Sequence, residues 1–203
     1  DGKLWWNWPT SAVQDGIDFS TGLYKKYYGE KDWRTKAACT ISHMRLWQHC
    51  IDINEPIMIL EHDANFIENF RYRILALSTS DKGEEWTGGV CGLNSPIGTT
   101  RKAKVFDVKV TDSLKASTGK MSDKVGLTIV PYVDDVSDLP LPSGLAGNSA
   151  YIIKPWAAKK LLAKVLEVGL WPNDALMCRQ FFPWLQVCYP YYTNVQNLPS
   201  TTK

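Results

Sequence analysis

A short apolar run followed at once by two carboxylates constrains this chain more than any other feature. Residues 57–60 (Ile-Met-Ile-Leu) predict a short buried strand, and Glu61 and Asp63 follow where that strand ends. In open α/β sheets, ligands gather outside the carboxyl ends of the strands. Two carboxylates one residue apart at such a place can share one hard divalent cation, which takes oxygen ligands and keeps positions free for phosphate. The segment therefore indicates a metal–diphosphate site.

Length and composition indicate an ordinary globular domain. The chain has 203 residues, enough for one full core, with 44% hydrophobic and 22% charged residues. A net charge of +2 points to no particular partner. No run approaches the roughly 20 apolar residues of a membrane-spanning helix. The five cysteines are scattered without a C-x-x-C pair, so we interpret them as reduced thiols of a cytoplasmic protein.

A strong helical pattern precedes the strand. From Thr35 onward, apolar residues recur every three to four positions, which predicts a helix. The positions on this face are Ala37, Ile41, Met44, Trp47 (or Gln48) and Ile51. Asn54 and Pro56 end the helix, because Asn favours the C-cap and Pro cannot continue a helix. Ser42 and His43 lie off this apolar stripe, and adjacent helical residues point about 100° apart, so they form no catalytic dyad.

The rest of the chain alternates between short strands and helices. Strands are predicted over residues 90–93, 105–110, 127–130 and 150–153. Pro155 begins a second helix that Gly169 ends, whereas residues 111–124 are polar and predict a mobile loop. This alternation favours an α/β fold, with a mixed central sheet flanked by helices on both faces. We expect a single domain over residues 1–203, with the strand 57–60 in the interior of the sheet.

Four motifs occur in an order typical of one enzyme family. Residues 38–47 read A-C-T-I-S-H-M-R-L-W, and the strand is followed by E-H-D-A at 61–64. Further on come G-N-S-A-Y-I-I at 147–153 and P-N-D-A-L-M at 172–177, and the tail holds Pro190, Gln196, Ser200 and Thr201. Together they resemble glycosyltransferase family 25. That family typically shows G-C-x-x-S-H-x-x-x-W, a strand ending L-E-D-D-A, G-x-x-A-Y and P-x-D-x-x-M, and it includes lipooligosaccharide and procollagen galactosyltransferases.

The resemblance implies a GT-A-like domain that transfers a hexose from a nucleotide sugar, UDP-linked, to a hydroxyl acceptor with inversion. The acceptor would be a glycan, as in lipopolysaccharide biosynthesis, a protein side chain or a modified DNA base. Glu61 and Asp63 would hold Mn²⁺ or Mg²⁺, which neutralises charge on the departing diphosphate. Asp174 would be the general base. The residues expected to contact the donor are Ser42, His43, Asn148 and Ser149.

Several departures keep other functions open. His62 stands where the family usually has Asp, and Ser149 where it often has His. The opening strand and the Arg-bearing helix of the family are not found ahead of Asp1, so either they are missing or residues 1–34 supply a divergent substitute. A non-catalytic, transferase-like binding module is therefore the alternative function, and a metal-dependent phosphoesterase is a third. Oligomeric state does not follow from the sequence.

Individual roles also have plainer alternatives. Asp174 follows a turn and would need no function as a helix N-cap, since Asp is a preferred N-cap residue. Asp134 and Asp135 are rival candidates for the base. A packing or capping role is the alternative for Ser42 and His43. Trp171 and Trp184 are candidates for a platform that stacks on an acceptor sugar, with core filling as the alternative.

Overall fold

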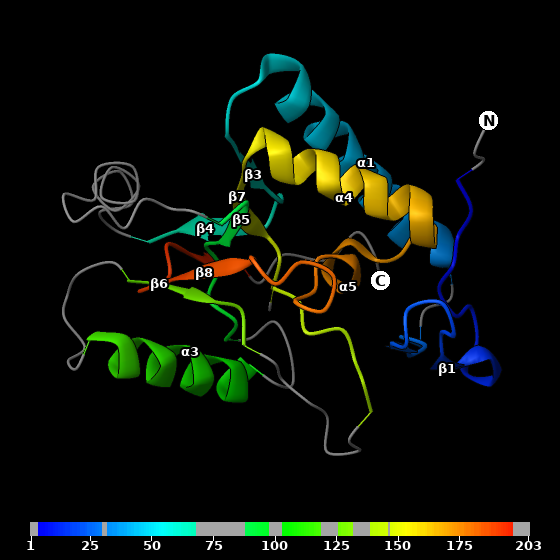
Figure 1. Ribbon diagram of the computed structural model, residues 1–203, viewed down its shortest axis with the longest axis horizontal. Coiled ribbons are helices and arrows are strands. Elements are labelled where there is room, and N and C mark those ends of the chain that lie inside the picture. The colour runs from blue at the N-terminus through cyan, green and yellow to red at the C-terminus, as the bar shows by residue number, and fades with distance from the viewer. Residues whose placement is uncertain are drawn as a thin grey trace.

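The computed structural model describes residues 4–29, 32–67, 88–97, 103–118, 126–131, 139–145 and 147–196. Figure 1 shows three layers, with helices α1 and α4 side by side on one side of the central sheet and helix α3 on the other. The predicted α/β fold with a mixed sheet flanked by helices is confirmed. None of the described helices combines the length and the apolar character needed to cross a membrane.

Helix α1 spans Trp33–Ile53 and begins and ends close to its prediction. The Asp32 side chain accepts a hydrogen bond from the backbone N–H of Arg34, which satisfies one of the unpaired donors at the helix start. Asn54 follows the last turn with a φ of 54°, a left-handed conformation that Asn tolerates better than most residues. The predicted C-cap at Asn54 is therefore confirmed.

The inward face of α1 is rotated from the predicted apolar stripe. Its buried residues are Ala37, Thr40, His43, Trp47 and Cys50. Ile41 is exposed and His43 is buried, so the prediction that His43 lies off the packed face is wrong. The reason is that this face meets polar partners. Thr40 Oγ1 donates to the backbone carbonyl of Trp171 at 2.7 Å, and the His43 ring bonds to Tyr151, so the buried polar groups are satisfied.

Five strands form the central sheet in the order β3-β7-β5-β8-β6. They span Ile57–Leu60 (β3), Ala150–Ile153 (β7), Val90–Gly92 (β5), Gln186–Tyr189 (β8) and Gly126–Ile129 (β6). β5 and β8 run parallel, and the other neighbouring pairs are antiparallel. The strands expected over 57–60, 90–93, 127–130 and 150–153 are confirmed to within a residue at each end.

Among the described strands, β3 lies at an edge of the sheet and pairs only with β7. The prediction that residues 57–60 lie in the interior is wrong. Of the four apolar side chains only Ile59 is buried, while Leu60 is 42% exposed. An apolar run does not distinguish an edge strand from a central one, because one covered face is enough to bury part of it.

Helix α3 spans Ala103–Thr118, where the sequence predicted a strand over 105–110 and a loop over 111–124. Both predictions are wrong as far as residue 118, and residues 119–124 lie outside the described part. The buried side chains recur at helical spacing, at Ala103, Phe106, Val110 and Leu114. Val105 and Val108, which produced the apparent alternation, are exposed. The polar residues of 111–116 largely form the outer face of the helix.

Helix α4 spans Pro155–Val168, with Pro155 in its first turn and Gly169 at its C-cap, as predicted. The short helix α5, Asn173–Leu176, comes soon after it. Between them Trp171 is fully buried and packs edge-on against Trp8, 5.1 Å between ring centroids. Trp171 is therefore a core residue, and its candidacy as a sugar platform is wrong.

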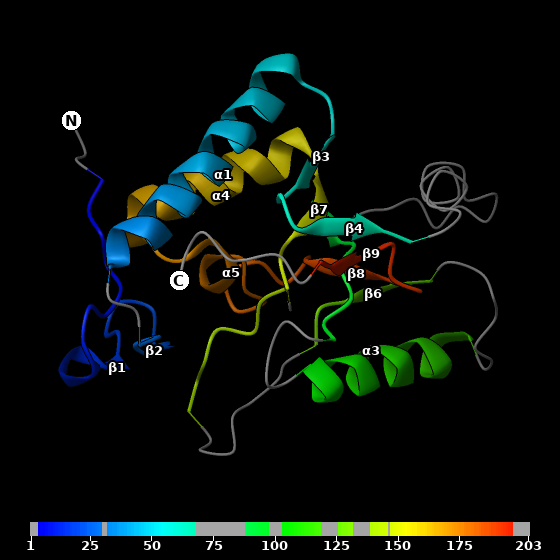
Figure 2. The ribbon, with the colours of Figure 1, turned by 180° about the vertical axis from the view of Figure 1, so that it is seen from behind.

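The remaining elements are short. Before α1 lie the 3₁₀ helix Ala12–Gln14 and a hairpin of β1 (Gly16–Ile17) and β2 (Tyr24–Lys25). β4 (Ala64–Phe66) follows β3 after a tight turn and pairs antiparallel with β9 (Thr193–Val195), as Figure 2 shows. The two carboxylates singled out in the sequence lie in the turn between β3 and β4.

Candidate functional site

A second segment folds beside the turn that carries Glu61. The backbone N–H of Glu61 donates to the carbonyl of Ser149 at 2.7 Å, and Leu60 pairs with Ala150 across β3 and β7. Asn148 and Ser149 therefore lie beside Glu61, although the two segments are far apart in sequence. Gly147 starts this segment with a φ of 64°, a conformation that favours glycine.

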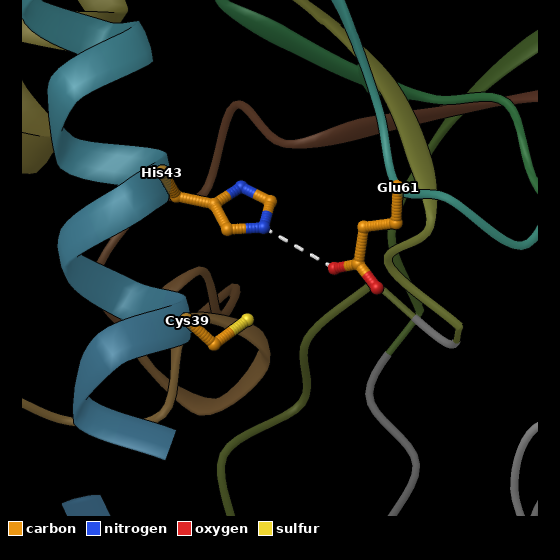
Figure 3. Close-up of side chains that lie close together, drawn as sticks. All are labelled: Cys39, His43 and Glu61. Carbon is orange, nitrogen blue, oxygen red and sulfur yellow. Dashed lines mark hydrogen bonds and ion pairs between the residues drawn. The ribbon is translucent and has the colours of Figure 1, made fainter. Parts of the chain in front are cut away.

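The Glu61 side chain reaches toward α1. Its Oε1 lies 3.2 Å from Nε2 of His43 (Figure 3). The His43 side chain is 5% exposed and that of Glu61 is 33% exposed. On its other side, the His43 ring stacks on Tyr151, with Nδ1 2.7 Å from the phenol oxygen. One carboxylate oxygen is thus held by the protein, while the side chain remains partly open to solvent.

Cys39 lies one helical turn before His43 and completes the group that we call the Glu61 cluster, namely Cys39, His43 and Glu61. Their potential ligand atoms lie within 4.8 Å of one another, a combination that zinc can use. Burial raises the pKa of the Cys39 thiol to about 11, and the charges of Glu61 and Asp174 add to this effect. The thiol therefore stays protonated at neutral pH. Sequence reasoning missed Cys39, although C-x-x-x-H spacing places both side chains on one helix face.

Asp63 is not part of the Glu61 cluster. Its backbone carbonyl accepts a hydrogen bond from the N–H of Gln196 at 2.8 Å. Its Oδ1 is buried and bonds to no group in the described part of the chain. A buried carboxylate oxygen without a donor costs free energy, so this atom could hold a cation. His62, between the two carboxylates, is exposed, as expected for a residue that points to the other side of the chain.

Asn148 and Ser149 present further buried polar atoms. They are 8% and 5% exposed. Neither the amide of Asn148 nor the Ser149 hydroxyl has a hydrogen-bond partner within the described residues. Because most buried polar groups in proteins are hydrogen-bonded, such a concentration of unpaired groups is typical of a binding site. An amide and a hydroxyl together can both donate to and accept from the hydroxyl groups of a sugar.

Ser42 lies elsewhere. It is exposed, and its hydroxyl donates to the Ala38 carbonyl of its own helix at 2.9 Å. The structure therefore brings His43, Asn148 and Ser149 of the expected donor contacts to Glu61, but it does not bring Ser42 there. Ser42 and His43 are neighbours on α1, so their side chains point about 100° apart and only His43 faces Glu61.

Asp174 is the second residue of α5, and the N-cap position belongs to Pro172, so the alternative that Asp174 is an N-cap is wrong. Its carboxylate accepts from the neighbouring N–H of Ala175 at 2.9 Å. The residue as a whole is exposed, but protein atoms crowd its carboxyl group, and this loss of hydration raises the pKa of Asp174. Lys36 opposes the rise and the charge of Glu61 adds to it. Asp174 thus lies within electrostatic reach of the Glu61 cluster.

Close backbone contacts fix the position of α5. Gly144 forms a bridge with Cys178, and a Cβ at residue 144 would lie 2.2 Å from the backbone oxygen of Asp174. Cys39 Sγ lies 3.8 Å from Oδ1 of Asn173, whose Nδ2 is buried without a described partner. Asn173 is a second site residue that sequence reasoning missed, because it looked like part of a turn. The rival bases Asp134 and Asp135 lie outside the described residues.

Comparison with known proteins identifies the family of the chain. The model of glycosyltransferase family 25, described as an LPS biosynthesis protein, matches residues 16–177, well over half of the chain. A search of curated proteins finds no match. The matched range includes the Glu61 cluster, Asp63, the 147–149 segment and Asp174. The chain therefore belongs to glycosyltransferase family 25.

Proposed function

We propose that this glycosyltransferase uses a divalent metal ion to move a hexose from a UDP-sugar to a glycan hydroxyl, with inversion. The observation that carries the proposal is that Oδ1 of Asp63 is buried and has no hydrogen-bond partner among the described residues. Asp63 follows Glu61 by two positions in the sequence. The family description refers to lipopolysaccharide biosynthesis, and for that reason we favour a glycan over a protein side chain or a modified DNA base as acceptor.

The oxygen donors of the turn suit Mn²⁺ or Mg²⁺. Glu61 and Asp63 would hold the ion, since hard cations prefer carboxylate oxygens and readily keep sites for phosphate. The protonated Cys39 thiol is a poor ligand for such an ion. When bound, the ion would supply a positive charge for the departing diphosphate. Asn148 and Ser149, whose buried polar atoms have no partner in the described ranges, would contact hydroxyl groups of the donor sugar.

Asp174 would act as the general base. In this single displacement the acceptor oxygen forms a bond to the anomeric carbon, and the bond from that carbon to the nucleoside diphosphate breaks with its electrons. The acceptor proton goes to the Asp174 carboxylate. Loss of hydration raises the pKa of Asp174, which makes its carboxylate a stronger base for the acceptor proton.

Slow hydrolysis of the donor tests this function without knowledge of the acceptor. The purified chain is incubated with UDP-galactose or UDP-glucose, with Mn²⁺ or with a chelator, and released UDP is measured. We expect Mn²⁺-dependent release that Asp63→Asn abolishes and that Asp112→Asn, an exposed carboxylate on α3, leaves unchanged. Donor binding without hydrolysis or transfer would instead favour the binding module. Hydrolysis that is equal with the chelator would contradict the metal site.

A further inference from the structure

Four side chains form one hydrogen-bonded chain that ends at Glu61. Trp47 Nε1 lies 2.8 Å from the phenol oxygen of Tyr151, which lies 2.7 Å from Nδ1 of His43. His43 Nε2 lies 3.2 Å from Glu61 Oε1. We infer that this hydrogen-bonded chain keeps the proton of His43 on Nε2 and makes His43 a positioning residue that holds the Glu61 carboxylate. The inference deepens the proposed function and rests on it only for the role of Glu61 in metal binding.

The direction of each hydrogen bond follows from which of these side-chain atoms can donate and which can accept. The indole N–H of Trp47 can only donate, so the Tyr151 oxygen accepts from it. The one phenolic proton of Tyr151 then points to His43 Nδ1, which must accept. A neutral imidazole that accepts at Nδ1 carries its hydrogen on Nε2, where it donates to Glu61.

The opposite arrangement leaves a buried group unsatisfied. If Nδ1 of His43 carried the hydrogen, two donors would meet at the Tyr151 oxygen, and the phenolic hydrogen would have no acceptor. Tyr151 is fully buried, and an unmade hydrogen bond there costs on the order of 1–3 kcal/mol. Burial also raises the pKa of the Tyr151 phenol well above its usual range, so the phenol keeps its proton.

This hydrogen-bonded chain of side chains distinguishes between two interpretations of the Glu61 cluster. A zinc site would need an unprotonated Nε2 on His43 as ligand, but the chain places a hydrogen there. His43 therefore orients the carboxylate and does not coordinate a metal through Nε2. Figure 3 shows one carboxylate oxygen directed at the His43 ring and the other turned away from it. The Glu61 side chain is 33% exposed, and its second oxygen would be the one that binds an ion, as in other sites where ligating carboxylates are themselves hydrogen-bonded.

The tautomer is measured directly by ¹⁵N NMR of the histidine-labelled protein without metal. His43 is assigned by the signals lost in His43→Gln, since His49 and His62 are the only other histidines. We expect the Nδ1 signal of an unprotonated nitrogen and the Nε2 signal of a protonated one. A hydrogen on Nδ1, or on both nitrogens, at neutral pH would overturn the inference.

The contact with Glu61 is tested in the same spectra. Glu61→Gln should move the Nε2-bound proton of His43 upfield, because a charge-assisted hydrogen bond becomes a weaker neutral one. Asp63→Asn is the matched control and should leave that proton unchanged, since Asp63 lies outside the cluster. Tyr151→Phe should yield a mixture of tautomers. An unmoved proton in Glu61→Gln would contradict the positioning role.

The consequence for the metal is measured by Mn²⁺ titration. His43→Leu should lower Mn²⁺ affinity by roughly 10–100-fold, the usual cost of losing an outer-shell partner, and His43→Gln should recover most of it through its amide N–H. If His43→Leu does not fold, the spectra of the wild type and of Glu61→Gln decide. Unchanged affinity in His43→Leu would contradict the inference alone. Absence of Mn²⁺ binding by the wild type, with the expected tautomer, would contradict the proposed function and leave the hydrogen-bonded chain intact.

Discussion

At the scale of single residues, the site contains several buried polar atoms that have no hydrogen-bond partner among the described residues. Asp63, Asn148, Ser149 and Asn173 each keep at least one such atom in the described part of the chain. By contrast, His43 and Tyr151 are fully engaged. We therefore expect His43 and Tyr151 to orient other side chains of the site, and the residues with unsatisfied atoms to bind the ligand.

Asp63→Asn tests the binding side of this division. The substitution removes the charge of a carboxylate whose Oδ1 has no described donor, so folding loses little. We expect the free energy of unfolding to stay within about 1 kcal/mol of wild type, as for sites that make few contacts. Calorimetric binding of UDP with Mn²⁺ should be lost. Retained Mn²⁺-dependent affinity would assign the metal to other residues.

Asp174→Asn tests the base. Asn keeps an acceptor for the Ala175 N–H, so donor affinity should survive while transfer falls by roughly 10²–10⁴-fold, the usual contribution of a general base. A raised pKa stabilises the folded state at low pH, and this stability is lost as the pH rises through the folded pKa. The Asn variant should therefore unfold at an equal or higher temperature than wild type at pH 7. Wild-type rates of transfer would shift the role to Asp134 or Asp135.

At the scale of elements, the position of α5 depends on the close approach of the segment that contains Gly144. A Cβ on Gly144 would lie 2.2 Å from the backbone oxygen of Asp174 and 3.0 Å from that of Met177, so backbone would have to move. Gly144→Ala should cost about 1–3 kcal/mol of unfolding free energy, as overpacking does, and should lower transfer because Asp174 is displaced. Gly16→Ala is the control, since nothing lies within 4 Å of its Cβ, and it should be nearly silent in both assays. Equal effects of the two variants would contradict this packing role.

At the scale of the whole molecule, the segment before α1 packs against the core at Trp171. Lys25 pairs with Asp18 at 2.6 Å, bonds to Asn7 and lies over the ring of Trp171, which leads into α5. Burial alone would raise the pKa of Asp18, but hydrogen bonds from Lys25 and Ser20 hold it well below its usual range. The pair therefore contributes stability above pH 3.8, the ordinary value for Asp, and this contribution is lost as the pH falls through the depressed pKa.

Asp18→Asn should separate this support from function. The Asp18 and Lys25 side chains are 8% and 12% exposed, and leaving one charge of a buried pair alone costs about 3 kcal/mol. We expect that loss in denaturant unfolding at pH 7 and a smaller loss at pH 3. Mn²⁺ affinity of the folded variant should match wild type. An equal loss at both pH values would contradict the ionic contribution.

The sequence by itself determined where helices begin and end, because these signals come from residues close together in the sequence. Asn54 and Gly169 end helices because of backbone conformations that few other residues adopt, and Pro155 starts one because it has no N–H to satisfy. The carboxylates after residues 57–60 marked the end of the sheet where Asn148 and Ser149 come to lie. The motif order indicated the family that the family model shows.

Only the tertiary structure decided which faces are covered and which distant side chains meet. Residues 105–110 alternate like a strand, yet packing against the sheet selects the helical spacing of Phe106 and Val110. His43 is buried because Tyr151, from a strand far along the chain, supplies a hydrogen-bond partner that no local pattern announces. Burial of a polar side chain depends on such partners, and partners are set by the fold, so the Glu61 cluster was not contained in any one segment of the sequence.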